Sequence, residues 1–218
     1  HRIARRQRQM CIRDRCNEAL KMLKGDREER IQGLRIFCEY RDTRSFPLLL
    51  PLLDQPCPVE RMSVVYALGR NPCPSAVEKL VSLLETDDNA YVRRATAWSL
   101  ANYDNQIVLE PLINALKNDV AAVRLWSSSS LAEIGNVSLE NAQLAAEQLL
   151  ISLKIDNESG VRSNCIWSLC RLYEKLNNTL QESFVDECTR IALFDKEPSV
   201  MEEAKTALDS MGMQGFYN

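Results

Sequence analysis

Hydrophobic and polar positions recur in six aligned segments of the chain, each with the same internal spacing. The segments are anchored at positions 30, 61, 93, 124, 162 and 201, so successive anchors lie 31 to 39 residues apart. Seven positions after every anchor stands a phenylalanine or a leucine. A period of about 20 to 50 residues is typical of repeat proteins, in which each unit buries its apolar face against its neighbours. Six such units leave no room for a second domain.

Each unit contains two helical patterns. The first is visible over residues 76–84 and 107–116, where apolar residues recur every three or four positions and mark one buried helix face. The second pattern starts at the anchor and carries small or apolar residues at positions +3, +4 and +7, as in Val64, Val65 and Leu68. The pattern therefore predicts a stack of helical hairpins in which these three positions pack between helices.

Acidic residues precede the anchor arginines by five to seven positions, and by six at Asp87 and Asp156. The predicted structural ladder consists of Asp54 and Arg61, Asp87 and Arg93, Asp119 and Arg124, and Asp156 and Arg162. A carboxylate near a helix N-terminus accepts backbone N–H bonds and complements the helix dipole. In a stack, the same carboxylate can also meet the arginine of its own unit or of the next one.

This Asp-x5-Arg ladder, followed by a small-residue helix ending in Ala-Leu-Gly or a variant, resembles the HEAT repeat. Residues 66–69, 98–101 and 167–170 are similar to the Trp-Ala-Leu-Gly segment of the cyanobacterial phycobilin-lyase-type (PBS lyase HEAT-like) subclass. The resemblance covers about residues 16–212 and implies an all-α fold, a right-handed α-solenoid of about six HEAT-like helical-hairpin repeats. The last unit departs from the pattern at Met201, and its acidic face is typical of a capping repeat.

Charge is spread unevenly along the chain. Residues 1–15 carry six arginines and one acid, whereas residues 16–218 hold 21 basic and 29 acidic residues. We interpret residues 1–15 as a non-native or disordered basic arm, because Gln9–Arg15 resembles a translated sequencing-adapter peptide. The alternative is a nucleic-acid or membrane-surface tail. We expect a single HEAT-repeat solenoid domain at 16–212 and a short tail at 213–218.

The candidate chemistry is limited by a single histidine, which is residue 1. Without an internal histidine there is no Ser-His or Cys-His nucleophile pair and no imidazole metal cluster. The seven glycines form neither a GxGxxG turn nor a P-loop. Catalytic residues, metal ligands and cofactors are therefore not assigned. The eight cysteines are expected to be reduced, and with no apolar segment of membrane-spanning or signal-peptide kind we expect a cytoplasmic protein.

The second helices of HEAT arrays line the concave surface, so residues at +2, +5 and +9 should face a groove. This places all three tryptophans on the groove rather than among the packing positions. The candidate partner-binding groove consists of Tyr66, Arg70, Arg94, Trp98, Asn102, Trp126, Glu133, Asn164, Trp167 and Arg171. Exposed Trp, Tyr and Arg on one face are the composition of a binding hot spot. The alternative is that the tryptophans fill gaps between successive second helices.

The leading prediction is a non-enzymatic scaffold or adaptor whose concave groove binds a partner protein, without a cofactor. The acidic repeat body argues against binding to nucleic acid, and no membrane contact is expected. The resemblance implies two cyanobacterial settings. One is a HEAT partner of an iron–sulfur assembly factor. The alternative is a subunit of a phycobilin lyase, which attaches a phycobilin to a phycobiliprotein cysteine and often works as a heterodimer.

Overall fold

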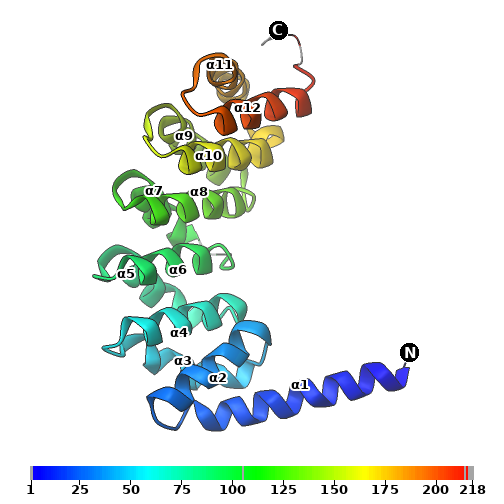
Figure 1. The fold of residues 1–218 in the computed structure, drawn as a ribbon, viewed down its shortest axis with the longest axis vertical. Helices are drawn as coiled ribbons and strands as arrows, with labels where there is room; N and C mark the ends of the chain where they lie inside the picture. Colours follow the sequence, from blue (N-terminus) through cyan, green and yellow to red (C-terminus); the bar gives the residue numbers. More distant parts are fainter. Residues whose placement is uncertain (1, 105, 214, 216–218) are drawn as a thin grey trace. The chain divides into compact units, whose positions relative to one another are not determined.

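The computed structural model describes residues 2–104, 106–213 and 215, with side chains from Gln9 onward. All regular elements within these residues are helical and none is a strand, so the predicted all-α fold is confirmed (Figure 1). The chain divides into two compact units, one ending at Tyr103 and one beginning at Asp104. The single domain expected at 16–212 stays a prediction.

Unit 1 consists of three helical hairpins whose second helices stack on one another (Figure 1). The first hairpin is α1 (Arg2–Met22) with α2 (Arg27–Glu39). The second hairpin has a broken first arm made of η1 (Thr43–Ser45), α3 (Phe46–Leu49) and η2 (Leu50–Asp54), followed by α4 (Pro58–Arg70). The third is η3 (Pro74–Ala76) and α5 (Val77–Thr86) with α6 (Ala90–Leu100). The stacked second helices are α2, α4 and α6.

Unit 2 also consists of three hairpins. They are α7 (Leu109–Asn118) with α8 (Ala121–Gly135), α9 (Leu139–Ile155) with α10 (Ser159–Leu172), and α11 (Asn178–Phe194) with α12 (Pro198–Ser210). Short 3-10 turns, η4 (Gln106–Val108) and η5 (Tyr173–Lys175), precede α7 and follow α10. The first helices stack as one layer and the second helices α8, α10 and α12 as another. The sequence-predicted first helices at 76–84 and 107–116 correspond to α5 and α7.

The prediction that each second helix starts at its anchor is wrong by one turn. All six second helices begin three residues earlier, at positions 27, 58, 90, 121, 159 and 198. The reason is local capping. The side chain of Asn89 accepts the N–H groups of Tyr91 and Val92 at the start of α6, and Pro58 occupies the first turn of α4, where a missing N–H needs no partner. The anchor arginine therefore lies in the second turn, from which it can reach back to the preceding loop.

The predicted packing positions form the core of both units. Val64, Val65 and Leu68 are fully buried in unit 1, and so are their counterparts at +3, +4 and +7 of α6 and α8. In the first hairpin, Gly33 of α2 permits a close approach of α1, because a Cβ there would lie only 3.0 Å from the carbonyl oxygen of Ala19. The prediction that small or apolar residues at +3, +4 and +7 pack between helices is confirmed at these positions.

Helix α1 continues without a break through the segment assigned to a basic arm. Its C-terminal part packs on α2 and buries Cys16 and Ala19, while the helix before it extends beyond α2 (Figure 1). Arg15 donates a hydrogen bond of 3.0 Å to the hydroxyl of Tyr40. Residues 2–15 are thus helical, and their origin stays a prediction. Residues 214 and 216–218 of the predicted tail lie outside the described residues. Among the described helices, none is long and apolar enough to cross a membrane.

Candidate functional site

Two ladder arginines, Arg61 and Arg124, each join their second helix to the loop before the next second helix of the same unit. Arg61 donates from Nε and Nη2 to both carboxylate oxygens of Asp87, at 2.8 and 2.9 Å. Arg124 does the same to Asp156, at 2.7 Å for both bonds. The remaining Nη1 of each arginine donates to carbonyl groups of its own loop, such as that of Gln55 for Arg61. Each of these arginines therefore pairs with the acid of the following repeat.

The ladder extends beyond the predicted residues at both ends. Arg162 donates to Asp195 at 3.0 and 2.7 Å, and Arg30 donates to the buried Glu60 at 2.5 Å. Asp195 precedes Met201 by six residues, which is the ladder spacing, but the missing arginine at position 201 hid it from sequence reasoning. Glu60 gave no such signal, because it lies inside a helix rather than in the loop before one.

Three predicted ladder residues, Asp54, Arg93 and Asp119, make contacts of other kinds. Asp54 departs from the ladder, because its exposed carboxylate pairs with Lys79 of α5 instead of an arginine. Arg93 donates from Nη1 to the carbonyl of Asp87 at 2.7 Å, as its counterparts do to their own loops. The carboxylate of Asp119 accepts the N–H of Val120 at 2.7 Å, next to the start of α8.

Three ladder carboxyl groups have a pKa below their ordinary value. Burial raises the pKa of Asp87, but the hydrogen bonds from Arg61 and from the N–H of Asn89 outweigh it. The same balance holds for Asp156 beside Arg124 and for Asp195 beside Arg162. These carboxylates are ionised at neutral pH, and each accepts hydrogen bonds from an arginine and from a backbone N–H, so they serve the packing of the repeat.

The opposite side of each second helix carries a row of residues at positions −3, +1, +5 and +9 from the anchor, none of which is buried. We call the row in unit 1 the unit 1 stripe. It consists of Arg27, Ile31, Arg35 and Glu39 of α2, Pro58, Met62, Tyr66 and Arg70 of α4, and Ala90, Arg94, Trp98 and Asn102 of α6 and the residues after it. The predicted groove residues of this half of the chain all belong to this row.

An aromatic cluster lies at the centre of the unit 1 stripe. The rings of Tyr66 and Trp98 are 5.3 Å apart at an angle of 54°, and Arg94 donates from Nη2 to the hydroxyl of Tyr66 at 3.3 Å. The indole lies where Gly69 lacks a side chain, because a Cβ on Gly69 would come within 2.5 Å of Trp98 Cζ3. Trp98 therefore fills part of the gap between α4 and α6 and is partly exposed. Its role in binding a partner stays a prediction.

The ends of the unit 1 stripe are polar. Arg70 is exposed and donates from Nε to the carbonyl of Glu39 at 3.3 Å. The amide of Asn102 donates to the carbonyls of Trp98 and Ser99 at 3.4 and 3.3 Å, so it closes the C-terminus of α6. Asn102 therefore has a structural role that its position in the sequence did not reveal.

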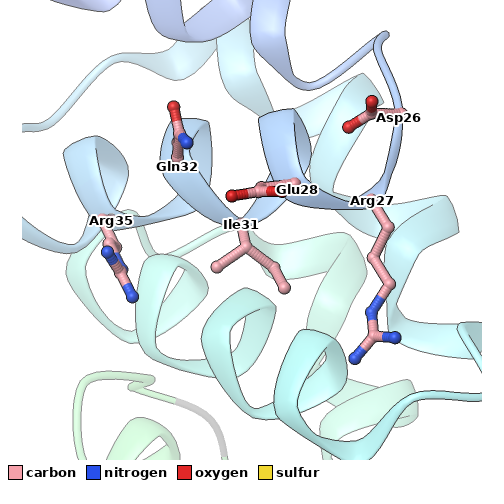
Figure 2. A pocket seen from close by; sticks show the side chains of 6 residues that line it. All are labelled: Asp26, Arg27, Glu28, Ile31, Gln32 and Arg35. Atoms are coloured by element: carbon pink, nitrogen blue, oxygen red, sulfur yellow. The ribbon is translucent and has the colours of Figure 1, made fainter.

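A hollow of about 560 Å³ lies beside α2 at the first-repeat end of the same stripe. It is lined by Asp26, Arg27, Glu28, Ile31, Gln32 and Arg35 (Figure 2). The side chains of Arg27, Ile31 and Arg35 extend to the same side of the helix. Gln32 and Arg35 occupy the +2 and +5 positions expected to face a groove, but without an aromatic residue they were not among the candidates.

The equivalent row in unit 2, the unit 2 stripe, has a different composition. It consists of Ala121, Leu125, Ser129 and Glu133 of α8, Ser159, Ser163, Trp167 and Arg171 of α10, and Pro198, Glu202, Thr206 and Ser210 of α12. The guanidinium of Arg171 lies 4.8 Å from the centre of the Trp167 ring and forms an ion pair of 2.6 Å with Glu133. These three predicted residues therefore form one satisfied cluster.

The remaining two predicted residues of unit 2 behave differently from each other. Trp126 lies at +2 of α8 and is 36% exposed. Asn164 donates to the carbonyl of Leu125 at 3.0 Å and to the hydroxyls of Ser128 and Ser129 at 2.7 and 2.6 Å. Its amide thus bridges α8 and α10 and is already fully engaged. Among the described residues, no group of three or more His, Cys, Asp or Glu side chains is arranged to hold a metal ion.

The family comparison agrees with this repeat geometry. The family of HEAT repeats matches residues 17–101 and again residues 77–170, which together make up more than half of the chain. The chain belongs to the HEAT-repeat family. The phycobilin-lyase-type subclass is not part of that match. No curated protein matches this HEAT-repeat chain.

Solved structures share the fold of the HEAT-repeat chain. An engineered protein is 21% identical with a TM-score of 0.65, over 89% of this chain and 98% of its own. A designed armadillo repeat protein in complex with the peptide (KR)4 is 18% identical with a TM-score of 0.63, over 92% of this chain and 98% of its own. A second designed armadillo repeat protein is 19% identical with a TM-score of 0.61, over 92% and 99%. At these identities the likeness concerns the fold alone.

Proposed function

We propose that this HEAT-repeat chain is a scaffold or adaptor that binds a partner protein on the stripes of its second helices. The observation that carries the proposal is the half-exposed aromatic cluster of Tyr66 and Trp98, with Arg94 beside it, on a row of residues of which none is buried. Tyr, Trp and Arg are the residues most enriched among binding hot spots. The designed armadillo protein of similar fold, which holds a (KR)4 peptide, supports this type of use.

The proposal is tested by capture on the immobilised full chain with one variant per unit. Arg70→Glu changes the unit 1 stripe and Trp167→Ala the unit 2 stripe, and both residues are exposed. Phe194→Ala is the matched control, because Phe194 is 75% exposed on α11 and lies outside both stripes. We expect a protein retained by the wild type and by the control to be lost from at least one stripe variant. Equal retention by all four proteins would overturn the proposal.

Two finer proposals come from the resemblance to the phycobilin-lyase-type subclass. In the first, the partner is an iron–sulfur assembly factor. In the second, the chain is a lyase subunit that orients a phycobilin. The presence of Trp98, Arg70 and Arg94 on the same stripe supports the second, because a phycobilin offers a flat ring system and two carboxylates. Mixing the chain with phycocyanobilin and an apo-phycobiliprotein distinguishes them. A red-shifted, covalently retained chromophore supports the lyase, and an unchanged spectrum with retention of an assembly factor supports the scaffold.

A further inference from the structure

The charged groups of the unit 1 stripe are unbalanced. The stripe holds the four arginines Arg27, Arg35, Arg70 and Arg94, against one acid, Glu39. None of these four guanidinium groups forms an ion pair with a carboxylate in the described part of the chain. Guanidinium stays charged at any physiological pH and matches a carboxylate with two parallel hydrogen bonds. The surface therefore presents four positive groups without a partner of opposite charge.

The ladder arginines provide an internal reference for this observation. Arg61, Arg124 and Arg162 each donate two hydrogen bonds to a single carboxylate across neighbouring helices. The four arginines of the unit 1 stripe lie on another face of the second helices, and within the described residues they have no such carboxylate partner. The one arginine of the unit 2 stripe, Arg171, is also neutralised, by Glu133. Unpaired guanidinium on a stripe is thus a property of unit 1.

Each unpaired arginine of the stripe has an apolar or aromatic side chain one helical turn away. In α2, Ile31 stands between Arg27 and Arg35, and all three extend to the same side (Figure 2). In α4, Tyr66 stands one turn before Arg70 and Met62 stands two turns before it. In α6, Trp98 stands one turn after Arg94. A ligand that satisfied this row would carry acidic groups separated by apolar groups. An extended peptide with alternating acidic and apolar residues supplies both kinds of group, with its acidic side chains along one edge and its apolar side chains along the other, because neighbouring side chains point to opposite sides.

We propose that the unit 1 stripe binds an acidic protein segment whose carboxylates alternate with apolar side chains. The proposal rests on the proposed function and names its class of partner. The surroundings favour a peptide over a nucleic acid. Asp26 and Glu28 line the same hollow as Arg27 and Arg35, and residues 16–103 hold 12 basic and 12 acidic residues. A ligand with a phosphate at every nucleotide would meet these acids, whereas spaced carboxylates can avoid them.

The experiment measures fluorescence anisotropy of labelled eight-residue peptides with the full chain. Three peptides alternate leucine with aspartate, lysine or serine, and a uridine octanucleotide serves as a fourth probe. We expect the aspartate peptide to bind at least about tenfold more tightly than the other three probes at low salt. We also expect this preference to shrink at 300 mM salt, since exposed charges are screened over about 10 Å or less.

Variants locate the binding site. Arg35 is exposed and makes no hydrogen bond within the described residues, so Arg35→Glu should fold normally. The double variant Arg35→Gln/Arg94→Gln removes two charges from the stripe. Its matched control, Arg41→Gln/Lys117→Gln, removes two exposed charges outside it. We expect Arg35→Glu and the stripe double variant to lose at least about tenfold in affinity for the aspartate peptide, and the control to lose less than about twofold.

Each outcome decides between the two proposals. Binding of the lysine or serine peptide, lost in Tyr66→Ser, would overturn the acidic-partner proposal and leave the scaffold function intact. Tighter binding of the uridine octanucleotide would assign the unit 1 stripe to nucleic acid and overturn the acidic-partner proposal. Binding of the aspartate peptide that is equal in all variants would place the site elsewhere and overturn the acidic-partner proposal. Absence of binding by every probe at 1 mM would also overturn it, while the scaffold function is judged by the capture experiment.

Discussion

Unit 1 and unit 2 carry different side chains at equivalent positions of the same helical hairpin. Position +9 is Arg70 in α4, where the guanidinium has no carboxylate partner within the described residues, and Arg171 in α10, where Glu133 neutralises it. Residues 104–218 hold nine basic and 17 acidic residues, whereas residues 16–103 are balanced. The repeat therefore constrains which residue types occupy the packing and ladder positions, whereas the residue types of the stripe vary between the units. Recognition of a partner would therefore be a property of each unit.

The tryptophans at +5 show the same contrast in packing. Trp98 in unit 1 lies against Gly69, where there is no side chain to displace it. The matching position of α8 in unit 2 is Ala132, and Trp167 is 40% exposed with the guanidinium of Arg171 over its ring. Trp98 is thus partly structural, whereas Trp167 is available at the surface. The two sites differ in the residue eight positions after the anchor of the preceding second helix, which is Gly69 in unit 1 and Ala132 in unit 2.

The largest expected effect concerns the ladder, in which the two units should not differ. Asp195→Ala leaves the guanidinium of Arg162, only 6% exposed, without its carboxylate. Asp87→Ala does the same to Arg61, which is 16% exposed. Removing one partner of a buried ion pair strands the other charge, so we expect each variant to lose about 3 kcal/mol in the free energy of unfolding. Urea denaturation followed by circular dichroism measures the loss.

Asp54→Ala is the control for the ladder. Asp54 and Lys79 are 67% and 38% exposed, so their ion pair should contribute less than about 1 kcal/mol. A loss for Asp54→Ala as large as that for Asp195→Ala would contradict the assignment of Asp195, and not Asp54, to the ladder.

Acid should weaken both units through the same carboxylates. Burial raises the pKa of Asp87, Asp156 and Asp195, but their arginine partners lower it further, so each folded pKa lies below the unfolded one. A depressed pKa gives stability that is present at neutral pH and is lost as the pH falls through the folded value. We expect the free energy of unfolding to fall mainly below about pH 4. In Asp195→Asn the slope in this range should be smaller, and an unchanged slope would show that the Arg162 pair does not contribute.

The two tryptophans should differ in what they contribute to folding. Trp98→Ala removes contacts with Tyr66 and Gly69 and opens the gap between α4 and α6, for an expected loss of about 2 kcal/mol. Trp167→Ala removes an exposed ring and should cost less than about 1 kcal/mol. The same denaturation experiment compares them. Equal losses in the free energy of unfolding would mean that Gly69 does not determine how Trp98 packs.

Gly69→Ala tests the same point from the other helix. The added Cβ would lie 2.5 Å from the indole, so the ring must move. We expect the emission of Trp98 to shift to longer wavelength in a Trp126→Phe/Trp167→Phe background, in which only this tryptophan remains. An unchanged emission spectrum would contradict the close packing.

The sequence alone was enough to predict the fold, because burial at +3, +4 and +7 is a periodic signal that every repeat reinforces. Val64, Leu68 and Leu131 are buried as expected. Helix starts were predicted one turn late, because caps such as Asn89 leave no periodic trace. The candidate surface was predicted only in part. Aromatic residues drew attention to Tyr66 and Trp98, whereas the importance of Arg35 depends on its guanidinium forming no ion pair within the described residues, which only the packed structure shows.

Thiol reactivity gives the smallest and most local difference between the units. The N–H of Glu60 at the start of α4 donates to Cys57, which lowers the pKa of this thiol, and Arg27 donates to its sulfur at 2.8 Å. In unit 2, burial raises the pKa of Cys170 to about 11 and also raises that of Cys188. Since the thiolate is the reactive form, we expect iodoacetamide at pH 7 to modify Cys57 at least about tenfold faster than either.

Mass spectrometry of the digested protein resolves each cysteine, including the exposed Cys11, which should also react. Arg27→Gln removes the guanidinium beside Cys57 and should slow its modification, while the rates at Cys170 and Cys188 stay unchanged. The matched control is Arg41→Gln, which removes an exposed arginine that makes no contact with this thiol. Similar modification rates at Cys57 and Cys188 would mean that unit 2 opens readily enough to expose its core. The predicted difference between the reactive thiol of Cys57 and the unreactive thiols of Cys170 and Cys188 would then be wrong.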